Sequence, residues 1–225
     1  MPSIAIILPT LNEEQTIARV IDDIPREKLE QQGYSLDIIV ADSSSDDNTT
    51  GIARDRGARV IVESQRGKGR AVRAALKQVT ADYVFMLDSD YTYPAGYIPD
   101  MLHVLESGSA VVIGSRLKGE REKGAMSRLN VIGNHLLTLL ARILYGSNIS
   151  DLCTGYWGFR GEAISRLELS ANGFDLEADL FTQARKKGYA IAELPIRYRS
   201  RPTPAKLSSF RDGARIAWAL LRRKV

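Results

Sequence analysis

Short runs of apolar residues alternate with segments of helical periodicity over the first half of this chain. The apolar runs cover residues 4–8, 37–41, 59–62, 83–87 and 110–114. The segments between them, with helical spacing of apolar residues, cover 13–24, 48–56, 69–79 and 97–105. Continuously apolar strands joined by crossover helices are typical of a parallel sheet covered on both faces. Residues 1–115 are therefore predicted to form an α/β sandwich on a parallel sheet.

The pattern changes after residue 115. Apolar residues at three- and four-residue intervals predict an amphipathic helix over 129–144, whose apolar face is expected to pack on the sheet. The elements predicted further along are a strand or bend at 155–160, a helix at 174–187, one or two strands over 189–199 and a basic helix at 210–223. Neither a linker nor an internal repeat divides the chain, so a single domain is expected.

A helix-start signal follows the first apolar run. Thr10 and Glu13 have the T-x-x-E spacing of a capping box. In that motif the two side chains satisfy free main-chain N–H groups at the start of a helix. The spacing predicts that the first strand passes to its helix at this point.

The composition, with 44% hydrophobic and 26% charged residues, is that of a soluble globular chain. One cysteine and two histidines exclude an internal disulfide and leave too few ligands for a cysteine or histidine zinc site. The N-terminus lacks the basic segment of a signal peptide, and no uncharged run reaches the ~18 residues of a membrane span. These features favour a cytoplasmic location.

Charge is distributed unequally along the chain. Residues 1–100 carry 11 basic and 16 acidic side chains, whereas residues 101–225 carry 20 basic and 11 acidic ones. Much of the excess lies in residues 197–225, a segment that attracts phosphate groups or acidic lipids. Nucleic acid is not an expected partner, because the final helix offers few aromatic residues, Phe210 and Trp218, for base stacking.

Polar residues follow four of the predicted strands. In an open α/β sheet, ligands bind beyond the carboxyl ends of the strands, so residues at these ends are candidates for a site. They are Pro9, Thr10, Asn12 and Glu13 after the first strand, Asp42 and Asp46 after the second, Lys68 after the third, and Asp88, Ser89 and Asp90 after the fourth. Their gathering on one edge predicts a ligand site there.

Asp88 and Asp90 occupy alternate positions at the end of an apolar strand. Two carboxylates there repel each other and lose solvation unless a cation lies between them. A hard divalent ion such as Mg²⁺ or Mn²⁺, which also bridges to a diphosphate, suits the pair. The alternative is two capping aspartates in a turn.

Arg66-Gly67-Lys68-Gly69 lacks P-loop spacing, and no G-x-G-x-x-G follows the first strand. These two observations disfavour ATPase and Rossmann dehydrogenase functions.

Taken in order, the motifs resemble one known family. They are Pro9-Thr10-Leu11-Asn12-Glu13, the run from Asp42 to Asn48, Arg66-Gly67-Lys68-Gly69, Asp88-Ser89-Asp90, Gly114-Ser115-Arg116, Thr154-Gly155-Tyr156, and Arg201 with Lys206. The chain resembles, over nearly its whole length, the inverting GT-A glycosyltransferases of the dolichyl-phosphate mannose synthase type in family 2. The resemblance implies a GT-A fold, with a donor-binding half (1–115) and an acceptor-binding half (116–225).

The resemblance also implies a role for each candidate residue. The residues implied to bind a nucleotide sugar are Pro9, Thr10, Asn12, Glu13, Asp42, Asp46, Lys68, Asp88, Ser89 and Asp90. Those implied to be catalytic are Asp88, Asp90 and Arg116, of which Asp88 and Asp90 hold Mg²⁺ or Mn²⁺. Those implied to bind the acceptor's phosphate are Arg116, Arg128, Arg201 and Lys206. The implied reaction moves a hexose from a GDP-mannose or UDP-glucose type donor to a polyprenyl or dolichyl phosphate.

This reaction needs no general base, because a lipid monophosphate is already an oxyanion near neutral pH.

The resemblance is incomplete in the late loop. The family sequence there is usually R-x-G-x-S-K, whereas this chain has Arg201-Pro202-Thr203-Pro204-Ala205-Lys206. Some relatives append transmembrane helices that are absent here. Peripheral contact with the cytoplasmic face of a membrane is therefore expected from the basic helix after residue 210, where Trp218 lies among leucines and arginines.

Three alternatives remain at this point. Transfer to a hydroxyl acceptor would need a carboxylate base, for which Asp151 and Asp175 are candidates. The Asp-x-Asp-x-Thr sequence after an apolar strand, residues 88–92, also resembles the nucleophile motif of haloacid-dehalogenase-type phosphatases. A nucleotide-sensing or partner-binding subunit of an envelope-assembly complex is the non-enzymatic alternative.

Overall fold

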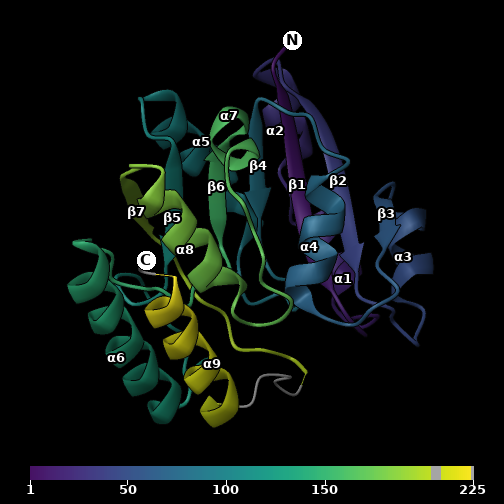
Figure 1. The fold of residues 1–225 in the computed structure, drawn as a ribbon. Helices are drawn as coiled ribbons and strands as arrows, with labels where there is room; N and C mark the ends of the chain where they lie inside the picture. Colours follow the sequence, from purple (N-terminus) through teal and green to yellow (C-terminus); the bar gives the residue numbers. More distant parts are fainter. Residues whose placement is uncertain (204–208, 224–225) are drawn as a thin grey trace.

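The structure is a computed structural model that describes residues 1–203 and 209–223. Within these residues the chain forms a seven-stranded sheet flanked by helices (Figure 1). The strands are β1 (Ser3–Thr10), β2 (Ser35–Asp42), β3 (Arg59–Val62), β4 (Tyr83–Met86), β5 (Val111–Ser115), β6 (Trp157–Arg160) and β7 (Ile191–Pro195). The helices are α1 (Ile17–Asp22), α2 (Arg26–Gln31), α3 (Thr49–Asp55), α4 (Lys68–Leu76), the 3-10 helix η1 (Ala95–Tyr97), α5 (Ile98–Glu106), α6 (Arg128–Tyr145), α7 (Gly161–Ser165), α8 (Leu176–Lys186) and α9 (Ser209–Arg222).

The sheet is mostly parallel, in the order β3-β2-β1-β4-β6-β5-β7. β1 pairs in parallel with β2 and β4, β2 with β3, and β5 with β7. β6, from the second half of the chain, runs antiparallel between β4 and β5. The predicted α/β class is confirmed. The five strands predicted in residues 1–115 are all present, but they do not lie side by side in one parallel sheet, because β6 separates β4 from β5.

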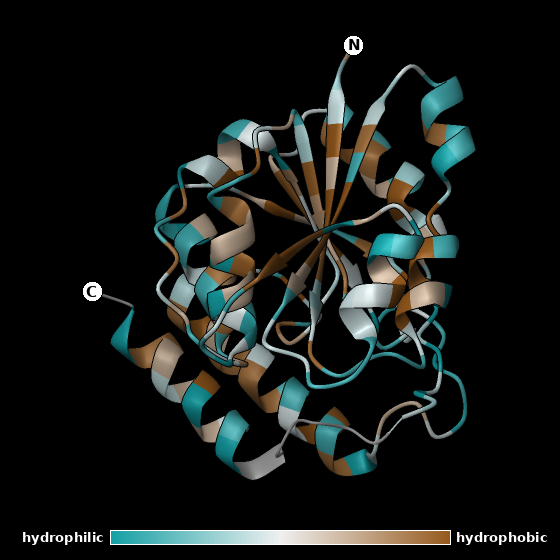
Figure 2. Cartoon of the chain, turned by 90° about the vertical axis from the view of Figure 1, so that its right-hand side faces the viewer, coloured by the Kyte–Doolittle hydropathy of each residue, from teal (hydrophilic) through white to brown (hydrophobic). Residues whose placement is uncertain are grey.

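Helices cover both faces of the sheet, and the alternation of side chains along the strands explains the two layers. In β1, Ile4, Ile6 and Leu8 are buried with residues of α1, α2, α3 and α5. Ala5 and Ile7 point to the other face, where the buried cluster includes residues of α4, α6, α8 and α9. Figure 2 shows the hydrophobic strands at the centre, between helices of mixed character. The central strands β1, β4 and β5 are almost entirely apolar because both of their faces are covered.

The predicted capping box is not formed. Thr10 is the last residue of β1, and its hydroxyl donates to the main-chain oxygen of Leu8 (2.8 Å). α1 begins only at Ile17, and the main-chain N–H of Glu13 donates to Thr49 Oγ1 (2.8 Å) in the neighbouring loop. The residues with capping-box spacing therefore belong to the strand end and its loop.

Contrary to the prediction from the sequence, the apolar residues of α6 do not all face the body of the protein. Leu137, Leu140 and Leu144 pack inward against the buried cluster that includes residues of α9. Five other apolar residues of the same helix are exposed: Leu129, Ile132, Leu136, Leu139 and Ile143. Apolar residues occupy two sides of this helix, and only one side can face the body. In the fold, α6 lies beside α9, at the end of the sheet opposite the N-terminus (Figure 1).

Among the described residues, no helix combines the length and apolar character that crossing a bilayer requires.

Candidate active site

The carboxyl ends of β1, β2 and β4 meet at one edge of the sheet. Thr10 and Asp42 are register partners at the ends of β1 and β2. Ser89, in the loop after β4, donates from its hydroxyl to the main-chain oxygen of Pro9 (2.8 Å). The main-chain oxygen of Ser89 accepts from Thr16 Oγ1 (2.8 Å). The structure therefore brings together the strand ends that the sequence predicted to converge.

The loops after β1 and β2 are fastened to each other. Asp42 is buried, and its carboxylate accepts from the main-chain N–H (2.9 Å) and the hydroxyl (2.5 Å) of Ser45. Asn12, with a φ of 50°, donates from its main-chain N–H to Ser45 Oγ (2.8 Å) and accepts from the N–H of Asp46 (2.8 Å). Asp46 is exposed and pairs with Arg66. The predicted contact of these residues with a nucleoside stays a prediction.

Lys68 lies between two carboxylates instead of pointing into solvent. Its Nζ donates to Asp88 Oδ1 (2.5 Å) and to Glu177 Oε1 (2.6 Å). Burial disfavours the ammonium, but the two carboxylates outweigh it and raise the pKa of Lys68. Burial also disfavours the charged form of Glu177 and therefore raises its pKa, against the opposing effect of Lys68. Lys68 thus joins α4, the loop after β4 and α8.

Gly155 gives the Asp88 carboxylate its space. A Cβ at position 155 would overlap the Asp88 carboxylate. The main-chain N–H of Gly155 donates to Tyr93 Oη (2.7 Å), and this fixes the loop before β6 against the site. The Thr154-Gly155-Tyr156 segment singled out from the sequence therefore lies directly against Asp88.

Asp90 is buried, and both of its carboxylate oxygens have partners. Its Oδ1 accepts from the main-chain N–H (3.1 Å) and hydroxyl (2.5 Å) of Thr92. Its Oδ2 pairs with Arg201 Nη1 (3.2 Å), and the same guanidinium pairs through Nη2 with Glu13 Oε1 (2.7 Å). Arg201, which the resemblance implies to bind the acceptor's phosphate, is thus fixed between two carboxylates of the first half of the chain.

The pair Asp88 and Asp90 fits a divalent cation. Burial, and then the charge of Asp88, raise the pKa of Asp90, so a positive charge at this point would relieve the repulsion. Mg²⁺ is commonly held by one or two carboxylates together with phosphate oxygens of a substrate. Within residues 1–203 and 209–223, no group of three or more His, Cys, Asp or Glu is arranged so that it could hold a metal ion. Substrate oxygens or water would complete the ligands of a cation held by these two carboxylates.

Arg116 forms a buried ion pair behind the site. Arg116 donates to Asp151 from its main-chain N–H (3.0 Å), its Nε (2.8 Å) and its Nη2 (2.7 Å). Asp151 also accepts from Asn134 Nδ2 (2.6 Å). Burial alone would raise the pKa of Asp151, but Arg116 outweighs burial and lowers it. The guanidinium also lies over the ring of Tyr198, 5.3 Å from its centroid.

Arg128 begins α6 and lines a groove of 410 Å³. The other lining residues are Arg121, Glu122, Met126, Val131 and Ile132. Glu122 in this groove accepts from the main-chain N–H of Ser200 (2.9 Å), which precedes Arg201 in the chain. The groove therefore lies next to the segment that reaches Asp90. Lys206 lies outside the described residues.

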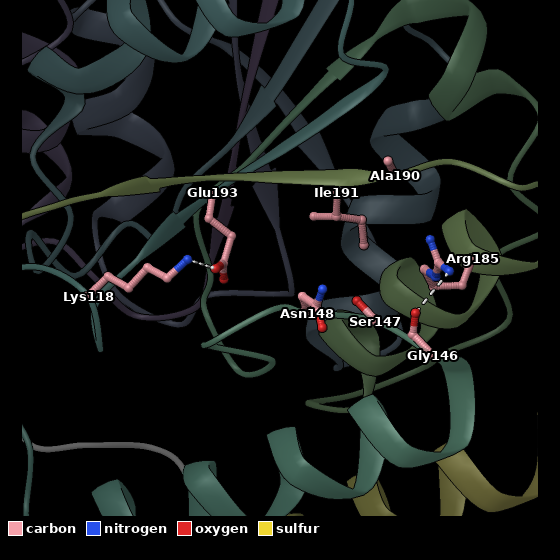
Figure 3. Close-up of a pocket in the computed structure, with 8 residues that line it drawn as sticks. All are labelled: Lys118, Gly146, Ser147, Asn148, Arg185, Ala190, Ile191 and Glu193. Atoms are coloured by element: carbon pink, nitrogen blue, oxygen red, sulfur yellow. Dashed lines mark hydrogen bonds and ion pairs between the residues drawn. The ribbon is translucent and has the colours of Figure 1, made fainter.

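A second cavity, of 370 Å³, opens near the edge strand β7 (Figure 3). Lys118 and Glu193 form an ion pair on one side of it, and Arg185 donates to the main-chain oxygen of Gly146 (3.5 Å) on the other. None of the residues predicted for the site lines this cavity. It is therefore separate from the strand-end site.

The two carboxylates proposed from the sequence as general bases are both paired. Asp151 is fully buried against Arg116, and Asp175 pairs with Arg223 (3.6 Å). Sequence reasoning missed Glu177 and Asn134. Glu177 could have been found, because α8 carries acidic residues in its first turn within an otherwise apolar helix start. Asn134 gave no signal, since it is one polar residue on a long amphipathic helix.

Comparison with known proteins defines the class to which this site belongs. A sequence model described as "Glycosyl transferase family 2" matches residues 5–167. The chain therefore belongs to glycosyltransferase family 2, and it is a glycosyltransferase.

Two similar proteins come from Haloferax volcanii. The chain is 38% identical to a dolichyl-phosphate hexose transferase, covering 97% of this chain and 92% of that protein. It is 37% identical to glycosyltransferase AglJ, covering 98% and 72%. The chain spans 52% of a third relative from the same organism, low-salt glycan biosynthesis hexosyltransferase Agl6.

Solved structures confirm the GT-A fold. The chain superimposes on glucosyl-3-phosphoglycerate synthase from Mycobacterium tuberculosis in complex with UDP with a TM-score of 0.77 and 25% identity, covering 99% of this chain and 80% of that one. A complex of that synthase with Mn²⁺, UDP and glucosyl-3-phosphoglycerate superimposes with a TM-score of 0.77 and 26% identity.

Proposed function

We propose that this protein is a divalent-cation-dependent hexosyltransferase that moves a hexose from a nucleotide sugar to a polyprenyl or dolichyl phosphate. The single observation that carries the proposal is the position of Asp88 and Asp90 at the strand ends, beside the loops held by Asp42 and Asn12. The synthase with the same fold binds UDP and Mn²⁺, which supports a nucleotide-sugar donor and a cation here.

Asp88 and Asp90 would hold Mg²⁺ or Mn²⁺, which when bound neutralises charge on the leaving nucleoside diphosphate. Lys68 holds the Asp88 carboxylate from behind, and Thr92 orients that of Asp90. Fixed carboxylates avoid reorganisation when charge develops in the reaction. Residues 1–115 would bind the donor, and residues 116–225 the acceptor, within one catalytic domain.

A phosphate acceptor agrees with the charges of the second half. Arg128 lines a groove with apolar residues, which suits an amphiphile with an anionic end. Asp151 and Asp175 are each paired with an arginine, so neither is placed to remove a proton from a hydroxyl. A lipid monophosphate needs no such base. The similarity to a dolichyl-phosphate hexose transferase supports the same acceptor class.

Membership of a glycosyltransferase family removes the reasons for the phosphatase and binding-subunit alternatives. The hydroxyl-acceptor alternative is tested together with the main proposal. Purified protein is incubated with GDP-mannose or UDP-glucose, with Mn²⁺, Mg²⁺ or EDTA, and with either a polyprenyl phosphate or 3-phosphoglycerate. We expect cation-dependent formation of a glycosylated polyprenyl phosphate from one donor. Transfer to 3-phosphoglycerate alone would contradict the proposed acceptor.

Glu177 should influence cation affinity through Lys68. In Glu177→Gln, Lys68 keeps Asp88 as its charged partner and competes more strongly with the cation. We expect the Mn²⁺ concentration for half-maximal binding, measured by the Mn²⁺ electron paramagnetic resonance signal, to rise by about tenfold or more, as for other residues that orient metal ligands. Glu168→Gln, which removes an exposed carboxylate paired with Lys187, is the matched control. Equal Mn²⁺ affinity in both variants would show that Glu177 does not act on the cation site.

A further inference from the structure

The residue that follows Asp90 has a main-chain conformation that its side chain disfavours. Tyr91 has a φ of 67°, in the left-handed region where the Cβ of an L-residue crowds its own main chain. In the part of the chain that the structure describes, the other non-glycine residues with positive φ are Asn12 and Ser44. Short polar side chains offset this cost with local hydrogen bonds, which a tyrosine ring cannot make. Contacts with the rest of the protein must therefore hold Tyr91 in place.

Two arginines supply such contacts. The Cζ atom of Arg19 lies 3.9 Å from the centroid of the Tyr91 ring, and the Cζ atom of Arg199 lies 4.3 Å from it. A guanidinium over the face of an aromatic ring is attracted by the ring's quadrupole. Arg19 belongs to α1, and Arg199 lies in the segment after β7. The ring is therefore held by two parts of the chain that are far apart in sequence.

An ion pair fixes Arg199 and the chain that follows Tyr91. The carboxylate of Asp23, directly after α1, accepts from Nη1 (3.1 Å) and Nη2 (3.4 Å) of Arg199. It also accepts from the main-chain N–H of Ala95 (2.9 Å). The main-chain N–H of Arg199 donates to the main-chain oxygen of Thr92 (2.9 Å). The same pair thus holds the segment after Tyr91 at two points.

The conformation of Tyr91 determines how the Asp90 carboxylate is oriented. The main-chain N–H and the hydroxyl of Thr92 both donate to Asp90 Oδ1, and these bonds close a turn with Tyr91 at its centre. A negative φ at Tyr91 would rotate the chain that follows and move both donors of Thr92 away from this oxygen. The orientation of the carboxylate therefore depends on a φ that tyrosine adopts only under constraint.

We propose that Tyr91 is a positioning residue of the active site. Its ring, held by Arg19 and Arg199, keeps the left-handed turn that aims the Asp90 carboxylate at the cation. The inference rests on the proposed function, because it takes Asp90 as a cation ligand. A ring that merely filled space would stabilise the fold and leave cation binding unchanged, and the test separates these two roles.

The test replaces Tyr91 by phenylalanine, alanine or glycine, none of which changes the charge of the protein. Phenylalanine keeps the ring, alanine removes the ring and keeps the cost of a positive φ, and glycine removes both. Mn²⁺ alone is titrated into the protein, and its electron paramagnetic resonance signal gives the half-saturating concentration. This concentration should stay within about twofold for Tyr91→Phe and rise about tenfold or more for Tyr91→Ala, as for other residues that orient metal ligands. Tyr91→Gly should bind Mn²⁺ at least about threefold more tightly than Tyr91→Ala, because glycine adopts the turn without steric cost.

Melting temperatures of the cation-free variants give a second, independent readout. At most positions a protein with alanine is more stable than one with glycine, because glycine loses more conformational freedom on folding. At a residue held at positive φ the order reverses, so Tyr91→Gly should melt about 2–4 °C above Tyr91→Ala. Tyr189→Ala removes a half-buried tyrosine whose φ is not positive and is the matched control. It should lower the melting temperature and leave the Mn²⁺ affinity unchanged.

Three results would overturn the proposal. Equal Mn²⁺ affinity in the unmodified chain and all three variants would show that the ring acts on stability alone. Equally weakened Mn²⁺ binding in Tyr91→Ala and Tyr91→Gly would show that the ring does not act through the turn. A Tyr91→Ala protein that melts above Tyr91→Gly would show that Tyr91 is not held at positive φ.

The proposed function can fail separately. Mn²⁺ affinities in the expected order, without transfer to any prenyl phosphate, would support the role of Tyr91 and contradict the proposed acceptor. Cation-dependent transfer to a prenyl phosphate, with equal Mn²⁺ affinity in Tyr91→Ala and the unmodified chain, would overturn the role of Tyr91 and leave the proposed function in place. An unmodified chain that binds no Mn²⁺, alone or with UDP, would contradict both.

Discussion

Replacement of Asp90 by asparagine should abolish sugar transfer while leaving the fold intact. The carboxylate is buried next to Asp88, and its pKa is raised by burial and by that neighbouring charge. Removing the charge takes away a proposed cation ligand, and we expect kcat/KM to fall on the order of a thousandfold or more. Folding should suffer little, because the amide retains an oxygen for Thr92, relieves the repulsion with Asp88 and leaves Arg201 its second carboxylate, Glu13.

Two measurements on Asp90→Asn separate catalysis from stability. The first is kcat/KM for transfer, and the second is the melting temperature with and without UDP and Mn²⁺. Ligand that binds only the native state raises the melting temperature of the unmodified chain, and this rise should vanish in the variant. Asp37→Asn, which removes an exposed carboxylate paired with Arg59, should change neither quantity. Retention of a tenth or more of the activity by Asp90→Asn would refute a cation role for Asp90.

Replacement of Asp151 by asparagine should destabilise the fold strongly. It leaves the buried guanidinium of Arg116 without its carboxylate, and breaking a buried pair in this way costs about 3–5 kcal/mol. For a chain of this size the melting temperature should fall by about 10 °C. Urea unfolding of the variant gives the free energy directly. A loss below about 1 kcal/mol would mean that the pair contributes little more than an exposed ion pair.

The same pair predicts a pH dependence. Because the folded-state pKa of Asp151 is lowered from 3.8, the carboxylate stabilises the fold above that value. This contribution is lost as the pH falls through the folded-state pKa. The difference in unfolding free energy between the unmodified chain and Asp151→Asn should therefore be full near pH 6 and decrease as the pH is lowered below about 4. A difference that grows on acidification would contradict the direction of the shift.

The convergence of the site could be predicted from the sequence, because it follows from a local rule. Apolar strands alternate with helices, and the polar residue after each parallel strand must lie on the same edge. This rule placed Asp42 and Asp88 correctly. It did not give the ion pairs that join the site to distant parts of the chain: Lys68 meets Glu177 across 109 positions, and Arg201 meets Glu13 across 188.

The errors have physical causes of the same kind. Thr10 and Glu13 have the spacing of a capping box, yet β1 continues through Thr10 because β2 pairs with it to that residue. The helix α6 was predicted correctly, but the prediction that its apolar residues all pack on the body was wrong. A helix with apolar residues on two sides gives no indication, within its own sequence, of which side meets the body.

The antiparallel strand β6 links the two halves of the chain during folding as well as in the folded state. β4 and β5 are made early in synthesis, but they meet only through residues 157–160. A growing chain therefore cannot complete the strand pairing beside Asp88 until most of its length has emerged, and pairings between distant residues are slow to form. A fragment that ends near residue 115 would have an unpaired β4 edge that other chains can join. The strand pairing beside Asp88 and the completion of the sheet thus depend on the same late strand.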